Sequence, residues 1–156
     1  MAKSHLFLSI LIFFFIIIII PLICGTPTNT SKLSLAHTQL IKYGFPIGLL
    51  PTNVHSYTIN TTTGDFCVVL NHNCRVTLPP DNYLATYSKK ITGKIVENKI
   101  NELNGINVKA FFRWWGITAI KNNGKDLTFE VGMLSAKYPA DKFGDSPACE
   151  GKHSSS

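Results

Sequence analysis

Residues 65–78 read Asp-Phe-Cys-Val-Val-Leu-Asn-His-Asn-Cys-Arg-Val-Thr-Leu, and apolar side chains recur there at every second position. A period of two is typical of β-strands that bury one face. The stretch therefore predicts two strands with a turn at 71–73 between them. The residues that share the buried faces are Phe66, Val68 and Leu70 in the first strand and Cys74, Val76 and Leu78 in the second.

The same alternation continues on both sides of this stretch. Tyr57 and Ile59 share one face of a preceding strand, and residues 61–64 turn the chain after it. Alternation resumes over 83–95, where Gly93 predicts a bulge or a close approach of two backbones.

Two Asn-Gly pairs predict further turns. Asn104-Gly105 and Asn123-Gly124 are hairpin signals, because a type I′ turn needs positive φ at both of its central residues. Between them, residues 106–115 alternate as one strand with two distinct faces.

A single amphipathic helix precedes the strands. It is predicted from residues at helical spacing, namely Leu33, Ala36, His37, Leu40 and Ile41. Ser31 or Ser34 can cap its start, and Gly44 is placed to end it. The two prolines and two glycines of 45–51 then predict an ordered, apolar loop.

Many short strands joined by Gly, Asn and Pro turns predict a mainly β fold. We expect an antiparallel pseudo-barrel or sandwich with one short N-terminal amphipathic helix. A single β-rich domain spans 33–150, the chain is irregular from Lys137 onward, and residues 151–156 form a polar tail expected to be disordered.

The start of the chain is typical of a secretory leader. Leu6–Ile20 is almost entirely apolar, a basic residue precedes it, and Pro21 and Gly25 follow. This predicts a signal peptide over 1–25, a linker over 26–32 and a secreted, extracellular protein. A retained signal anchor in a membrane is the alternative, because the apolar run is close to the length that spans a bilayer.

Two features bear on the surroundings of a secreted chain. Asn29 and Asn60 each begin an Asn-x-Ser/Thr acceptor, so glycosylation is expected at both in the secretory lumen. The 15 basic and 9 acidic residues give a net charge of +6, which favours anionic surfaces such as phospholipid or acidic polysaccharide. Solubility alone is the alternative explanation, and no motif indicates nucleic acid binding.

The cysteines permit one disulfide after cleavage. Losing the leader removes Cys24 and leaves Cys67, Cys74 and Cys149, an odd number that allows one bridge and one free thiol. Cys74 lies on the inward face of its strand and Cys67 on the outward face. We favour a Cys74–Cys149 bridge, which would close a long loop and tie the C-terminal segment to the sheet. A Cys67–Cys74 bridge is the alternative, with a different strand register.

No familiar catalytic signature occurs in the sequence. It contains no G-x-S-x-G, H-E-x-x-H, C-x-x-C or P-loop pattern, and its histidines lie in unrelated settings. We therefore expect no catalytic residue, no metal ligand and no cofactor, and an enzyme is less favoured than a binding protein.

The most suggestive constellation is one face of the strand predicted over 106–115. That face carries Lys109, Phe111, Arg113 and Trp115. Rings that enter an apolar layer beside cations that contact phosphates suit an anionic amphiphile. These four are candidate ligand-binding residues for an amphiphilic small molecule or an anionic lipid surface. The alternative is that Phe111 and Trp115 fill a second buried layer.

Elements spread over about 36–149 resemble, in order, the plant family called domain of unknown function 538. They are Tyr43–Pro51, Tyr57, Gly64, Phe66, Cys74, Tyr87–Ile95, Leu103–Ile106, Trp114, Ile117, Ile120, Phe129–Gly132 and Phe143–Cys149. The resemblance implies plant origin, a mainly β pseudo-barrel with an N-terminal helix, and recurrent cysteines at Cys74 and Cys149. Gly116 departs from a proline that is common in the family.

The resemblance implies no established activity. Likeness to bactericidal/permeability-increasing lipid binders and a pigment-ester hydrolase role have been suggested for the family. We expect an apoplastic, non-catalytic binder of lipid or another amphiphilic ligand. One alternative is a hydrolase of a hydrophobic ester, which would need a buried serine or histidine near a carboxylate. A cell-wall interaction protein is the other.

Overall fold

The computed structural model describes residues 26–27 and 34–151, which form one antiparallel sheet and three helical segments. The strands are β1 (Thr26–Pro27), β2 (Val54–Ile59), β3 (Asp65–Leu70), β4 (Cys74–Leu78), β5 (Tyr83–Val96), β6 (Lys99–Ala110), β7 (Arg113–Gly116), β8 (Ala119–Asn122), β9 (Asp126–Val131) and β10 (Leu134–Pro139). The helical segments are α2 (Leu35–Lys42) and the 3₁₀ helices η1 (Ile47–Leu49) and η2 (Ala140–Phe143).

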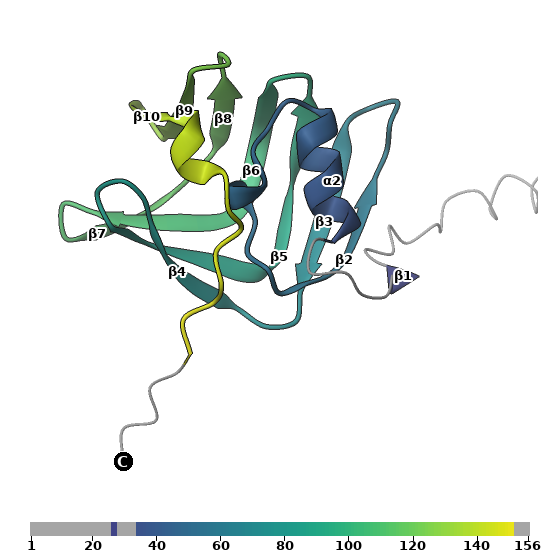
Figure 1. The fold of residues 1–156 in the computed structure, drawn as a ribbon, viewed down its shortest axis with the longest axis horizontal. Helices are drawn as coiled ribbons and strands as arrows, with labels where there is room; N and C mark the ends of the chain where they lie inside the picture. Colours follow the sequence, from purple (N-terminus) through teal and green to yellow (C-terminus); the bar gives the residue numbers. More distant parts are fainter. Residues whose placement is uncertain (1–25, 28–33, 152–156) are drawn as a thin grey trace, which may run out of the picture.

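The sheet is an open path and not a closed ring. Its order is β1-β2-β3-β5-β6-β8-β9-β10, while β4 adds to β5 and β7 adds to β6. The long strands β5 and β6 therefore have different neighbours along their lengths, and the sheet bends where the neighbours change (Figure 1). The predicted mainly β class with one short N-terminal helix is confirmed.

Strands β3 and β4 follow one another along β5 in the same direction. Residues 65–69 of β3 pair with 94–90 of β5, and residues 74–78 of β4 pair with 87–83. The turn predicted at 71–73 is therefore wrong as a reversal of the chain. Those residues only bend the chain between two successive strands, and the reversal lies after β4.

The hairpin turn predicted at Asn104-Gly105 is also wrong, because β6 runs through this pair. The chain reverses instead at residues 97–98, where Asn98 has a φ of 59°. Gly105 has a φ of +100°, and a Cβ atom there would lie 2.5 Å from the backbone oxygen of Lys90. Its glycine thus allows two bent strands to approach closely and does not build a turn.

Two other predictions about glycines are confirmed. At Gly93 the β5–β6 register shifts between Thr92 and Lys94, and a Cβ atom would lie 2.9 Å from the ring of Phe66. Gly124, with a φ of +90°, lies in the turn that joins β8 to β9.

The single strand predicted over 106–115 is wrong. The chain reverses at Phe111 and Phe112, whose φ values are 50° and 62°, and β7 pairs back onto β6. No glycine or asparagine marks this turn, so the usual sequence signal for it is missing. The tip of the resulting hairpin lies at the left edge of the molecule in Figure 1.

The chain after Lys137 is more regular than predicted. Strand β10 extends to Pro139 and pairs with β9 along its whole length, and η2 follows directly. The prediction of an irregular segment from Lys137 is therefore wrong at its start. At the other end, β1 pairs with β2, so Thr26 and Pro27 of the predicted linker belong to the sheet.

The core lies between α2 and the inner face of the sheet, which Figure 1 shows behind the helix. Ala36 and Leu40 of α2 are buried there, together with the loop residues Phe45, Leu49 and Leu50. Only about 50 Å³ remains unfilled beneath the helix, which is room for a few water molecules at most.

The predicted Cys74–Cys149 disulfide is confirmed, with a Cα–Cα distance of 5.2 Å. It holds the C-terminal segment against β4, and the backbone N–H of Glu150 donates to the oxygen of Arg75 at 2.8 Å. Cys67 is buried and is disulfide-bonded as well. The expected reduced Cys67 thiol is therefore wrong.

Several sequence predictions lie outside the described residues. These are the leader over 1–25, the glycosylation site at Asn29 and the end of the tail at 152–156, so all three stay predictions. Across the residues that the structure does describe, no helix has the length and apolar character needed to span a membrane. Asn60 is exposed in the turn between β2 and β3.

Candidate functional site

An apolar cavity of about 370 Å³ lies between the ends of three hairpins. The hairpins are β4–β5, β6–β7 and β9–β10, and we call the space between them the hairpin cavity. Side chains from all three line it, among them Leu78, Tyr83, Val108, Phe111, Leu134 and Tyr138.

The floor of the hairpin cavity is made of buried apolar side chains. Ile117, Phe129 and Phe143 line it and are all buried, and the rings of Phe129 and Phe143 lie 5.5 Å apart. Phe143 comes from η2, so the C-terminal segment forms part of the cavity floor. A packed floor keeps the hairpins apart and preserves the space between them.

Two tyrosines supply polar groups in this apolar space. The rings of Tyr83 and Tyr138 meet edge to face, with centroids 6.1 Å apart. Burial, together with a hydrogen bond that the Tyr138 hydroxyl donates to Tyr83, raises the pKa of Tyr138 to about 12. The Tyr138 phenol is therefore neutral at ordinary pH and can donate or accept a hydrogen bond.

The chain reversal at 111–112 separates the four residues predicted to share one strand face. In the β6–β7 ladder Lys109 lies opposite Trp114, whereas Trp115 lies opposite Val108. Residues directly opposite one another share a face of the sheet, and neighbours along a strand alternate. Lys109 and Trp115 are therefore on different faces, and the single stripe predicted from the sequence does not exist.

Phe111 is the one of these four that reaches the hairpin cavity in the described part of the chain. Arg113 is exposed beside it and lies opposite Ala110, which also lines the cavity. Trp115 is half-buried, and its indole N–H donates to the carbonyl oxygen of Ala110 at 3.1 Å. The structure thus places one exposed ring at the edge of the cavity, one cation beside that ring and one indole against the hairpin backbone.

The sequence reasoning missed the β9–β10 side of the cavity. Leu134, Ala136 and Tyr138 line it, and they alternate with more polar residues at a period of two. That pattern follows Gly132, whose φ of +62° fits a turn. Because the chain was predicted to be irregular from Lys137, Tyr138 was not recognised as the last position of this pattern.

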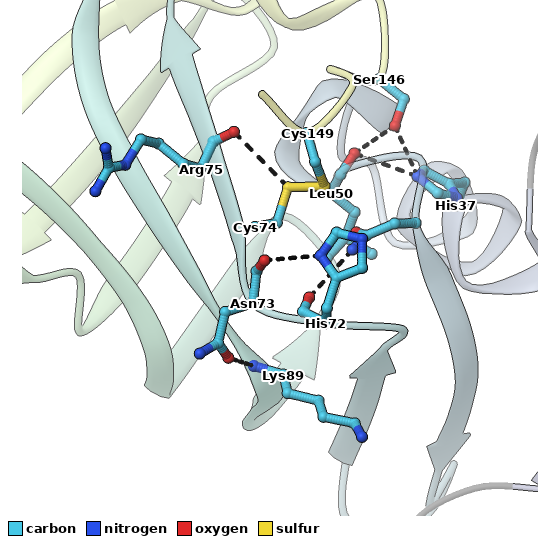
Figure 2. The surroundings of a disulfide bond; sticks show 10 residues. His37, Leu50, His72, Asn73, Cys74, Arg75, Lys89, Ser146 and Cys149 are labelled. Atoms are coloured by element: carbon cyan, nitrogen blue, oxygen red, sulfur yellow. Dashed lines mark hydrogen bonds between the residues drawn. A yellow bond between two sulfur atoms is a disulfide. The ribbon is translucent and has the colours of Figure 1, made fainter. Parts of the chain in front are cut away.

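A second cluster surrounds His37, which is fully buried at the start of α2 (Figure 2). Its Nε2 lies 2.9 Å from Ser146 Oγ and 3.3 Å from the Leu50 oxygen. Its Nδ1 lies 3.2 Å from the backbone nitrogen of Ser34. The hydrolase hypothesis requires a serine beside a buried histidine. Whether this pair could act as nucleophile and base depends on which atoms of His37 and Ser146 carry the protons.

The hydrogen bonds assign the protons of this cluster. The backbone N–H of Ser34 can only donate, so Nδ1 of His37 accepts and the ring proton is on Nε2. The Ser146 hydroxyl in turn donates to the Leu50 oxygen. Nε2 then has no lone pair with which to take the serine proton, and within the described residues His37 contacts no carboxylate that would reverse this tautomer.

The His37 cluster is therefore best explained as a structural clamp. It joins the start of α2, the loop around Leu50 and the C-terminal segment at Ser146. Figure 2 draws the Cys74–Cys149 disulfide in the same region, and Cys149 follows Ser146 by three residues. In the part of the chain that the structure describes, no group of three His, Cys, Asp or Glu side chains is placed to hold a metal ion.

A family model described as "Protein of unknown function, DUF538" matches residues 36–144, well over half of the chain. The chain belongs to this family. The DUF538 match begins in α2 and ends just after η2, so it includes the whole hairpin cavity and stops before Cys149. No curated protein matches the chain.

Proposed function

We infer that this DUF538 protein is a non-catalytic binder of an amphiphilic small molecule, and that the apolar part of the ligand occupies the hairpin cavity. The observation that carries this proposal is the cavity itself, whose volume of about 370 Å³ is lined almost entirely by apolar side chains. Small-molecule sites are typically concave, mostly apolar and larger than about 300 Å³, with a few placed polar groups.

The polar groups present suit a ligand with a hydrogen-bonding end. Tyr83 and Tyr138 line the cavity with phenol groups, and Ser135 adds a hydroxyl. Arg113 stands beside the mouth, where the head group of a partly inserted amphiphile would lie. A lysophospholipid or a fatty acid has this combination of a chain and a polar end.

The same observations disfavour a hydrolase. The hairpin cavity brings tyrosines and one serine together, and no histidine of the residues that the structure describes lines it. The buried Ser146–His37 pair has the wrong tautomer for general base catalysis and is used to join three segments. Secretion, if the predicted leader is cleaved, would place ligand binding outside the cell.

A cavity-filling variant tests this proposal. We expect the purified protein to bind the uncharged fluorescent probe N-phenyl-1-naphthylamine and to release it when a lysophospholipid is added. Ala136→Phe places a ring inside the cavity and should weaken probe binding by more than about tenfold. Lys137→Phe adds the same ring one position along β10, outside the cavity lining, and should leave binding unchanged.

Equal probe binding by wild-type protein and Ala136→Phe, with both folded, would show that the hairpin cavity is not the ligand site. Native mass spectrometry of protein purified from its natural source would then identify what is carried. A co-purified lipid-like molecule supports the proposal, and a bound polysaccharide fragment would instead support a cell-wall interaction protein.

A further inference from the structure

Two turn tips beside the hairpin cavity expose large apolar side chains to solvent. Phe111 is 83% exposed and Phe112 is fully exposed at the β6–β7 turn. Met133 is fully exposed and Leu134 is 53% exposed at the β9–β10 turn. Phe111 and Leu134 both line the hairpin cavity, so the two tips stand at the same mouth. We call these four residues the tip residues.

The aromatic residues at the first tip are not required by the fold. Phe111 and Phe112 have φ values of 50° and 62°, a pair of left-handed conformations that Asn-Gly adopts with little strain. For bulky residues such conformations are uncommon and cost stability. Because Phe112 is fully exposed, packing within the protein does not offset that cost. Contact between these rings and a partner outside the protein would offset that cost in stability.

Basic residues lie near both tips. Lys109 and Arg113 lie on either side of the Phe111-Phe112 turn, and Lys137 follows the second tip on β10. The segments 108–116 and 131–138 contain no acidic residue. Asp81 lies close enough to act on Tyr138, and Glu130 before the second turn is paired with Lys121. The three cations therefore outnumber the unpaired acidic side chain near the two tips.

We propose that the tip residues dock the protein onto an anionic lipid bilayer, with the mouth of the hairpin cavity facing the membrane. Exposed rings and aliphatic side chains enter the boundary between head groups and acyl chains, while neighbouring Lys and Arg side chains contact lipid phosphates. Two projecting turns suit such a soft surface, whereas a stable protein interface needs about 800 Å² on each partner. The inference goes beyond ligand binding and does not depend on it.

The first turn offers a variant that removes both rings without harming the fold. Phe111→Asn combined with Phe112→Gly installs the residue pair that this turn prefers, so its thermal stability should equal or exceed that of the wild type. In a sedimentation assay with vesicles of phosphatidylcholine and phosphatidylserine, the amount of this variant bound to vesicles should fall by more than about tenfold.

The second tip and a distant apolar residue provide the comparison. Met133→Ser with Leu134→Ser should also reduce vesicle binding. Ile41→Ser removes an exposed apolar side chain on α2 and should leave binding unchanged.

Charge and cavity variants separate the possible causes. Lys109→Glu with Arg113→Glu should weaken vesicle binding by more than about tenfold at low salt, and added salt should weaken wild-type binding. Ala136→Phe should still bind vesicles, because it changes only the cavity. Vesicle binding by folded Phe111→Asn/Phe112→Gly equal to that of the wild type would overturn the docking proposal while leaving ligand binding intact. Equal binding to vesicles without phosphatidylserine would overturn its electrostatic part.

Discussion

His37 joins three segments that are far apart in the sequence. Its ring contacts Ser34 at the start of α2, the Leu50 oxygen, and Ser146 near the C-terminus. The sequence places His37 on the buried side of a helix, and that much was predictable. Its partners were not, because Ser146 is brought in by the path of the chain after β10, which was predicted to be irregular.

The buried His37 makes stability depend on pH. Burial lowers the pKa of His37 below its ordinary value of 6.5, while hydrogen bonds to backbone oxygens of Leu50 and Pro51 oppose this effect. The unfolded chain therefore binds the proton more readily, and the contribution of His37 to stability is complete above pH 6.5. It is lost as the pH falls from 6.5 toward the folded-state pKa.

We expect the unfolding free energy, measured with urea between pH 7.5 and pH 4.5, to fall more in the wild type than in His37→Gln. Glutamine removes the titrating group and weakens the clamp by about 1–3 kcal/mol at pH 7.5. His72→Gln, at an exposed position, should keep the wild-type pH dependence. Parallel pH profiles of wild type and His37→Gln would contradict this assignment.

Asn60 is placed to accept a glycan if the chain is secreted. It is exposed between β2 and β3, and its Oδ1 accepts hydrogen bonds from the backbone nitrogens of Thr62 and Thr63. These bonds hold the turn and do not use the side-chain nitrogen, which is the atom that is glycosylated.

Expressed through a secretory pathway in an Asn29→Gln background, the protein should lose mass on treatment with peptide N-glycosidase. The additional change Thr62→Ala destroys the acceptor and should abolish that shift. Thr63→Ala, one residue beyond the acceptor, should retain it. A protein of unmodified mass in the Asn29→Gln background would contradict glycosylation of Asn60.

The strands were more predictable than the turns between them. Alternation identified β2, β3, β4 and most of β5, because burial of one face selects apolar side chains at every second position. Turns were misplaced because a glycine with positive φ can either form a turn or allow two strands to approach closely. Gly105 uses its positive φ for a close approach of strands, whereas Phe111-Phe112 forms a turn without any turn-forming residue. The candidate site lies at these turns, so it could not be assembled from the pattern.

Gly105→Ala and Gly124→Ala form a matched pair that separates backbone strain from crowding. Both glycines have positive φ, of +100° and +90°. A Cβ atom at Gly105 would collide with the backbone oxygen of Lys90 at 2.5 Å, whereas nothing lies within 4 Å of one at Gly124. We expect Gly124→Ala to lower the unfolding free energy by about 1–2 kcal/mol and Gly105→Ala by about 3 kcal/mol or more.

Urea denaturation of both variants measures this difference. Equal losses would mean that β5 and β6 are not pressed together at Gly105. The bend between the two halves of the sheet would then need another explanation.

The C-terminal segment after β10 connects the parts of the molecule that matter for the proposed function. Phe143 closes the floor of the hairpin cavity, Ser146 contacts His37, and Cys149 is bonded to Cys74 on β4. The segment also packs closely on η1, since a Cβ atom at Gly48 would collide with the Phe143 oxygen. The hairpin cavity and the His37 cluster therefore both depend on the C-terminal segment, which the Cys74–Cys149 disulfide holds in place.

Removing that disulfide should therefore loosen the cavity as well as lower stability. The bond joins residues 75 positions apart, so its loss should reduce the unfolding free energy by about 2–4 kcal/mol. The test uses Cys74→Ser with Cys149→Ser, because a reducing agent would also break the disulfide of Cys67. In this variant, backbone amides of η2 and of the start of α2 should both exchange hydrogen faster, and N-phenyl-1-naphthylamine should bind more weakly.

Ser146→Ala is the control. It should speed hydrogen exchange at the start of α2 while leaving probe binding near that of the wild type, because the disulfide still holds Phe143. Full probe binding in the double serine variant would show that the cavity floor stands without the disulfide.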